Sequence, residues 1–154
     1  MMEVTYSKGF ESIVSMRQKV ERVQEALAKL PQYEPRTTHR FHAGMYCREV
    51  WRAAGVMVVG KVHKKEHFYL IVSGTVCISD GIGEPQRFAG PHMIESLPGT
   101  KRAVLAETDV LCMTFHRTDA TTVEAAEDEL VEEEESTMYS PGNLIRIQNQ
   151  GVLR

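Results

Sequence analysis

Two histidines, His63 and His67, stand four residues apart in the stretch HKKEH. Neutral imidazole is a common protein ligand of divalent transition metals, and two of them at this spacing can hold one ion. The same side chains would also suit the polar end of a strand, with no metal involved. HKKEH therefore has two interpretations, a ligand pair or a polar strand end.

Strand alternation indicates which side chains share a face with each histidine. Successive residues of a strand point to opposite faces, so an inward His63 brings Lys61 inward, and an inward His67 brings Tyr69. Both of these neighbours can donate hydrogen bonds. The alternation thus predicts that Lys61 and Tyr69 are ligand-binding residues.

A third histidine and an arginine come from the segment 101–117. We expect this segment to form a hairpin that turns near Thr108, which would place Arg102 opposite Thr114 and turn His116 to the same face. The expected barrel mouth then holds six side chains, which are His63, His67, His116, Arg102, Lys61 and Tyr69.

These six side chains support three interpretations. Three neutral imidazoles with open coordination positions would suit a divalent metal such as Zn, Fe, Ni or Mn, and metal-dependent catalysis with it. Arg102 and Lys61 oppose a bound cation, whereas a guanidinium fork matches a carboxylate or phosphate, so a small-anion pocket is the second interpretation. In the third, the polar mouth is satisfied by its own hydrogen bonds and holds no ligand.

Length and composition limit the classes of protein to consider. A chain of 154 residues with 42% hydrophobic and 25% charged residues is typical of one soluble globular domain. The formal net charge of -3 argues against nucleic acid as a partner. No apolar run reaches the roughly 18–20 residues of a membrane span, and the charged N-terminus differs from a signal peptide. We therefore expect a cytoplasmic protein with no membrane partner.

The chain divides into three regions by pattern. We expect residues 1–35 to form a helical extension, residues 36–118 a β-barrel, and residues 119–154 an acidic helix with a tail. The middle region has short runs rich in Val, Ile, Tyr and Phe between turn residues, as in antiparallel sandwiches and barrels. Thr121 begins a capping-box match that predicts the C-terminal helix. The tail after it is apolar enough to dock as an edge strand.

An apolar stripe runs along the predicted N-terminal helix, which we expect to begin at Ser7 and to end at Pro31. Its members alternate at spacings of three and four residues, the a/d register of a coiled coil. A helix this short needs its stripe buried, either on its own barrel or against another subunit. The second alternative predicts a homo-oligomer held by Ile13, Met16, Val20, Val23, Leu27 and Leu30.

The spacing around HKKEH resembles the first motif of the cupin superfamily, G-x5-H-x-H-x3/4-E-x6-G. With Gly74 as its last glycine, His67 stands where the family has its glutamate, His63 at the second histidine and Lys61 at the first. In LPGTKR, which approaches the second motif, Arg102 stands where the family has its histidine. The resemblance implies a mainly β fold, a single double-stranded β-helix or jelly-roll barrel.

The layout from residue 8 to residue 135 also resembles small cupin-domain proteins encoded in tailed-phage and prophage genomes. The segments that carry this likeness are 30–32, 44–49, 53–55, 63–67 and 98–102. This resemblance implies a non-enzymatic structural, assembly or binding protein, either a virion component or a binder of a host protein or small ligand. The alternatives are a metal-dependent cupin enzyme of the dioxygenase or isomerase type, and a small-anion-binding cupin.

Overall fold

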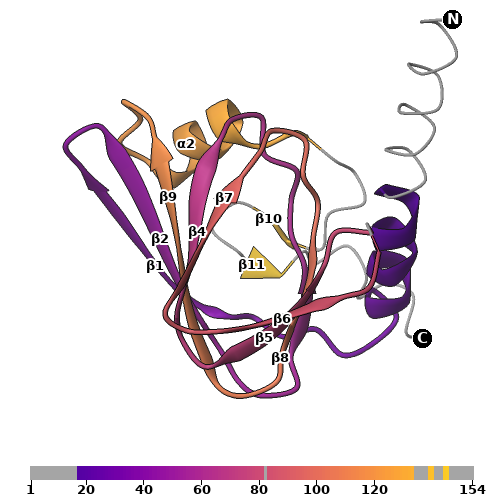
Figure 1. The fold of residues 1–154 in the computed structure, drawn as a ribbon. Coiled ribbons are helices and arrows are strands. Elements are labelled where there is room, and N and C mark those ends of the chain that lie inside the picture. The colour runs from indigo at the N-terminus through magenta and orange to yellow at the C-terminus, as the bar shows by residue number, and fades with distance from the viewer. Residues whose placement is uncertain (1–16, 82, 134–138, 141–143, 146–154) are drawn as a thin grey trace, which may run out of the picture.

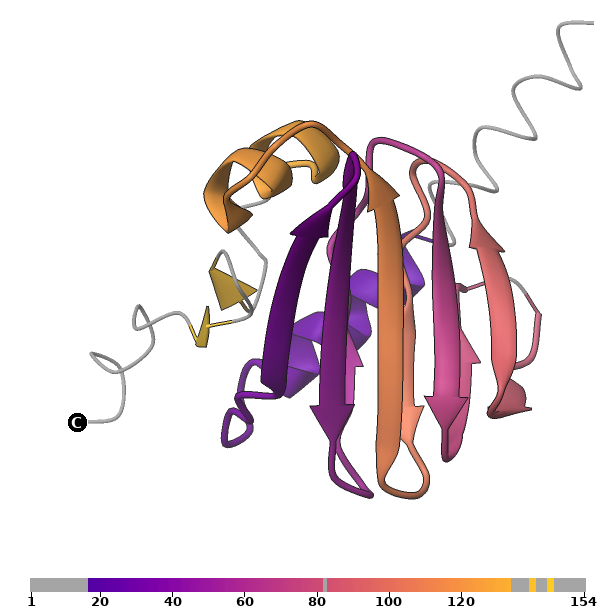
Figure 2. The same cartoon turned by 90° about the vertical axis from the view of Figure 1, so that its left-hand side faces the viewer.

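Two antiparallel sheets face each other in the computed structural model, which describes residues 17–81, 83–133, 139–140 and 144–145 (Figure 1). Figure 2 shows the larger sheet face-on, in front of the N-terminal helix. Its strand order is β1 (Arg36–His42), β2 (Met45–Arg52), β9 (Val110–Arg117), β4 (His67–Ser73) and β7 (His92–Ser96). The smaller sheet has the order β3 (Met57–Val59), β8 (Ala103–Ala106), β5 (Thr75–Ser79) and β6 (Gln86–Ala89).

The path of the chain between the sheets defines a jelly roll. Apart from the β1–β2 and β5–β6 hairpins, every connection from β2 to β9 crosses from one sheet to the other. The predicted fold class, a mainly β jelly-roll barrel with a helix at each end, is confirmed. The predicted pairing within 101–117 is wrong: β8 pairs with β3 and β5, whereas β9 pairs with β2 and β4. The turn near Thr108 passes between the sheets instead of closing a hairpin within one.

Apolar residues fill one half of the space between the sheets. Strand β9 has the strict alternation of a half-buried strand, with Val110, Cys112, Thr114 and His116 buried and their neighbours more exposed. Its first two inward residues belong to the main apolar cluster, which also contains Ile71, Val76, Ile78, Val104 and Ala106. Its last two inward residues are polar. The core therefore occupies one end of the barrel, and the other end remains available for a site.

The described part of the N-terminal helix, 17–27, packs on the smaller sheet (Figure 1). Val20 is buried against Val59 and Ala103, with Val23 and Leu27 beside it. Three residues of the predicted stripe thus pack against the barrel of their own chain. Leu30 is 57% exposed, and Ile13 and Met16, with the predicted start at Ser7, lie outside the described residues. A contact of the stripe with another subunit stays a prediction.

Helix α2 (Val123–Leu130) lies over the polar end of the barrel (Figure 1). Its N-cap is Thr122, one residue later than predicted, because the Thr122 hydroxyl accepts a hydrogen bond from the Ala125 N–H. Ala126 and Leu130 pack on Tyr46. In the tail, β11 (Leu144–Ile145) pairs with β10 (Tyr139–Ser140), and the rest of the predicted edge strand lies outside the described residues.

The end of β4 depends on a glycine that no other residue can replace without strain. Gly74 has φ +86°, and a Cβ there would collide with the Asp109 carbonyl oxygen and come within 2.7 Å of Val110 Cγ1. We expect Gly74→Ala to lower the free energy of unfolding by about 3 kcal/mol, through left-handed strain plus overpacking. Gly55→Ala is the matched control, since Gly55 has φ +85° but an open surrounding. Equal losses in urea titrations of the two variants would contradict the role of the collision.

Candidate metal centre and its cavity

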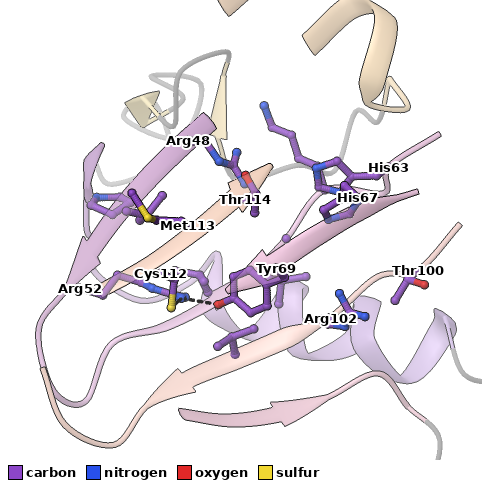
Figure 3. A pocket seen from close by; sticks show the side chains of 17 residues that line it. Arg48, Arg52, His63, His67, Tyr69, Thr100, Arg102, Cys112, Met113 and Thr114 are labelled. Atoms are coloured by element: carbon purple, nitrogen blue, oxygen red, sulfur yellow. Dashed lines mark hydrogen bonds between the residues drawn. The ribbon is translucent and has the colours of Figure 1, made fainter. Parts of the chain in front are cut away.

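Three histidines meet at the polar end of the barrel. His67 begins β4, His116 lies near the end of β9, and His63 lies in the segment before β4. Their possible ligand atoms all lie within 4.8 Å of one another. The ring centroids of His63 and His67 are 4.2 Å apart, and His116 stacks on both (Figure 3 labels the first two). The structure therefore brings together the three histidines that alternation had selected.

The backbone around His63 is fixed from two sides. Its carbonyl accepts a hydrogen bond from the Gly99 N–H at 2.9 Å, and it forms an isolated β-bridge with Val131. The next N–H, of Lys64, donates to the Leu130 carbonyl at 2.8 Å. HKKEH is thus a connection held between the end of α2 and the loop at Gly99, with its two histidines at the barrel mouth.

Hydrogen bonding and burial set the protonation of the imidazoles. His67 Nδ1 lies 3.3 Å from the Lys65 carbonyl, which only accepts, so Nδ1 carries the proton and Nε2 keeps a lone pair. Burial lowers the pKa of His63 to about 2 and that of His116 to about 3. Burial also lowers the pKa of His67 to about 4, and nearby arginine charges act in the same direction. All three are neutral at physiological pH, which is the form that binds metal.

Tyr46 supports the cluster from behind. It pairs with His116 across β2 and β9, and its ring stacks on that imidazole at 5.7 Å and on Phe41 at 4.6 Å. Its hydroxyl lies 2.6 Å from His39 Nδ1. Burial raises the pKa of Tyr46 to about 12, so the phenol stays neutral. Tyr46 is only 3% exposed, so it belongs to the interior of the barrel.

A cavity of about 120 Å³ lies next to the histidines (Figure 3). His63 and His67 line it, and so do the three predicted ligand-binding residues, Lys61, Tyr69 and Arg102. Sequence reasoning missed Arg48 and Arg52, which line it from β2. Their spacing could have indicated this position. Tyr46, Arg48, Val50 and Arg52 are every second residue of β2, so all four side chains lie on the same, inward face.

The cavity wall is positively charged. Three arginines and Lys61 contribute to it, and its lining contains no aspartate or glutamate. Lys61 Nζ is neutralised by the Glu127 carboxylate of α2 at 2.9 Å. Arg102 Nη1 donates to Ser96 Oγ at 2.8 Å, and Arg52 Nη2 donates to the Tyr69 hydroxyl at 3.0 Å. Burial raises the pKa of Tyr69 to about 12, so this neighbour of Arg52 is a neutral phenol.

The fold and this mouth define a jelly-roll barrel with a three-histidine mouth beside an arginine-lined cavity. No family model and no curated protein matches the sequence. The chain is similar to solved structures that include a cupin superfamily protein of Desulfitobacterium hafniense (11% identity, TM-score 0.48, 61% of this chain and 86% of that one). A second is a double-stranded β-helix protein of Klebsiella pneumoniae (12% identity, TM-score 0.49, 64% of this chain and 84% of that one). A third is the DMSP lyase DddQ of Ruegeria pomeroyi (15% identity, TM-score 0.49, 58% of this chain and 49% of that one).

These likenesses are below 16% identity and concern the fold alone. Within the described part of the chain, no helix has the length and apolar character needed to cross a membrane.

Proposed function

We propose that this protein is a metal-dependent, small-molecule cupin. His63, His67 and His116 would hold one divalent transition metal at the barrel mouth, and the adjoining cavity would hold the small molecule. The observation that carries this proposal is the cluster of three neutral imidazoles, with ligand atoms within 4.8 Å of one another, two of which line a cavity.

The donor set fits a transition metal. An ion that binds nitrogen at about 2.0–2.1 Å with tetrahedral angles holds its nitrogens ~3.4 Å apart, so the imidazoles would have to approach one another by roughly 1 Å to complete the site. Imidazole nitrogens suit Zn, Cu, Fe and Ni, whereas Mn favours carboxylate and carbonyl oxygens. With three protein ligands, the bound ion would supply a Lewis acid with positions open to a ligand.

The charges nearby add a condition to metal binding. The charges of Arg48 and Arg102 help to lower the pKa of His63, and they would also repel a cation. Three neutral imidazoles leave the full double charge of the ion uncompensated. We therefore expect the metal to bind more tightly when an anion occupies the cavity, and the anion to bind more tightly beside the metal.

A non-enzymatic phage-type role, as a virion component or as a binder of a host protein, remains a second proposal. Only the sequence resemblance supports it. It requires no metal, and a variant without the histidine cluster would keep it.

Metal content tests the proposal. We expect protein purified without a histidine tag or chelator to contain about one Zn, Fe, Ni or Cu ion per chain by mass spectrometry, the stoichiometry of a three-ligand site. The variant His63→Ala/His67→Ala should lose this ion and remain folded by circular dichroism. His42→Ala is the matched control, since His42 is exposed at the end of β1. A folded wild-type protein that neither contains nor takes up any of these ions would exclude the proposal.

A further inference from the structure

The inward side chains of the larger sheet form layers at the polar end. The outer layer contains His67 and His116. One step deeper, Arg48 of β2 pairs with Thr114 of β9, which in turn pairs with Tyr69 of β4. Inward residues of one strand are about 6.7 Å apart, so this second layer lies within one small molecule's length of the histidines. Figure 3 shows Arg48, Thr114 and Tyr69 around the cavity.

A buried hydroxyl in the second layer has a vacant hydrogen-bonding capacity. Thr114 is 5% exposed and lines the cavity, yet its Oγ1 has no hydrogen-bond partner among the described residues. Arg52 Nε, in a side chain that is 4% exposed, is also buried without such a partner there. Buried polar atoms are satisfied in most native structures, so two unsatisfied atoms on one cavity wall indicate a missing ligand with hydrogen-bond acceptors.

The charge of the wall indicates that this ligand is an anion. Within the described residues, no carboxylate lies within ion-pair distance of Arg52 or Arg102, although both line the cavity. Burial lowers the pKa of Arg102 and the charge of Asp80 acts in the opposite direction, so the missing negative charge concerns Arg52 above all. A buried guanidinium is costly without a compensating negative charge. Each guanidinium is a donor-only group that matches two oxygens of one carboxylate.

The size and the apolar part of the wall select a small organic acid. The volume of about 120 Å³ is small beside the ~300–1,000 Å³ of pockets for drug-sized ligands. Val50, Val58 and Val104 also line the cavity and can contact a short carbon chain. Inorganic phosphate would leave these valines without a partner.

We infer that the cavity binds a carboxylic acid of a few carbons, held by the Thr114 hydroxyl and the guanidinium groups of Arg52 and Arg102. Its carbon chain contacts the valines. Its other end faces the three histidines, and this last point alone rests on the proposed function.

Calorimetric titration of the protein as purified, and after removal of metal with a chelator, tests this inference. The probes are acetate, propionate, lactate and succinate, with propionamide and inorganic phosphate as the uncharged and non-carboxylate comparisons. At least one acid should bind, and the amide of the same size should bind more than tenfold weaker. Thr114→Val should weaken the acid about tenfold, as expected for the loss of one hydrogen bond to a charged group. Arg102→Gln should weaken it at least as much, and the surface control Arg87→Gln should not.

Two further measurements separate binding from stability and from metal. Thr114→Val should not lower the melting temperature, because the hydroxyl has no partner to lose, and its metal content should equal that of the wild type. The inference is overturned if no acid binds in either form, if propionamide or phosphate binds as well as the acids, or if Thr114→Val binds like wild type. Protein that holds metal but no acid would overturn the inference and leave the proposed function intact. Protein that binds an acid through Thr114, but neither contains nor takes up any of the tested ions, would support the inference and exclude the proposed function.

Discussion

Metal-free protein is expected to lose stability steeply between pH 6.5 and pH 5, above the range in which most carboxylates titrate. The unfolded chain takes up protons on histidine as the pH falls through 6.5. The folded chain does not, because burial holds the pKa of His63, His116 and His67 at about 2, 3 and 4. The unfolded state therefore binds more protons than the folded state, and the free energy of unfolding decreases as the pH is lowered.

The expected effect is large for a domain of this size. His63 and His116 each contribute about 2 kcal/mol of lost stability at pH 5, from 1.36 kcal/mol per pH unit below 6.5. His67 is half-buried, so solvent screening makes its contribution smaller. The cluster would therefore remove about 4–5 kcal/mol, a large part of the 5–15 kcal/mol that stabilises a typical domain, before most carboxylates are protonated.

Urea titrations of chelator-treated protein at pH 7.5, 6.5, 5.5 and 5.0 measure this dependence. His63→Gln/His116→Gln should reduce the slope by more than about two thirds, because glutamine does not titrate. His42→Asn, at an exposed position, should leave the slope unchanged. A wild-type stability that is flat to pH 5 would show that the cluster is not buried as described.

The sequence could predict which side chains of the site point into the barrel, because the alternation of side chains along a strand is a local property. Once His116 is placed inward, Thr114 and Cys112 follow, whichever strand pairs with β9. The wrong hairpin therefore still yielded the right side chains, since β9 pairs with β2 and β4 yet keeps the expected alternation. Arg102 lines the cavity from the segment before β8, so its inward position too was predicted through a pairing that does not exist, and its role as a ligand-binding residue stays a prediction.

The side chains that β2 contributes to the site could not be predicted from the sequence in the same way. A strand with one polar and one apolar face normally turns its polar face to solvent. In β2 the inward positions include Tyr46, Arg48 and Arg52, which therefore resembled a surface. Their role depends on the pairing of β2 with β9, about sixty residues away, and on the cavity that the two sheets enclose.

The stripe on the N-terminal helix shows a related limit. Apolar residues at three- and four-residue spacing need a partner surface, and the spacing is the same for a barrel of the same chain or for a second subunit. The structure places Val20, Val23 and Leu27 on Val59 and Ala103. The surface that buries a stripe is set by tertiary contacts that the local pattern does not encode.

The ion pair that attaches α2 to the barrel leads to the second large expected effect. Lys61 Nζ lies 2.9 Å from the Glu127 carboxylate, and the two side chains are only 12% and 8% exposed. Removing one partner leaves a charge where water has little access, in a cavity wall that already carries three arginines. We expect Glu127→Gln to lower the free energy of unfolding by about 3 kcal/mol, at the lower end for a broken buried pair.

A double variant separates the pair from its environment. Lys61→Met/Glu127→Leu removes both charges and keeps apolar volume, so its stability should return to within about 1 kcal/mol of wild type, as found when buried pairs are replaced by packed hydrophobic residues. Glu49→Gln is the matched surface control, because the Arg40–Glu49 pair is similarly short at 2.8 Å but its arginine is 53% exposed, and a loss below about 1 kcal/mol is expected. Urea unfolding at pH 7.5 measures all three. Equal losses for Glu127→Gln and Glu49→Gln would mean that water reaches Lys61, and α2 would then be held at the barrel mouth by its other contacts, among them the packing of Ala126 and Leu130 and the Lys65–Glu129 pair.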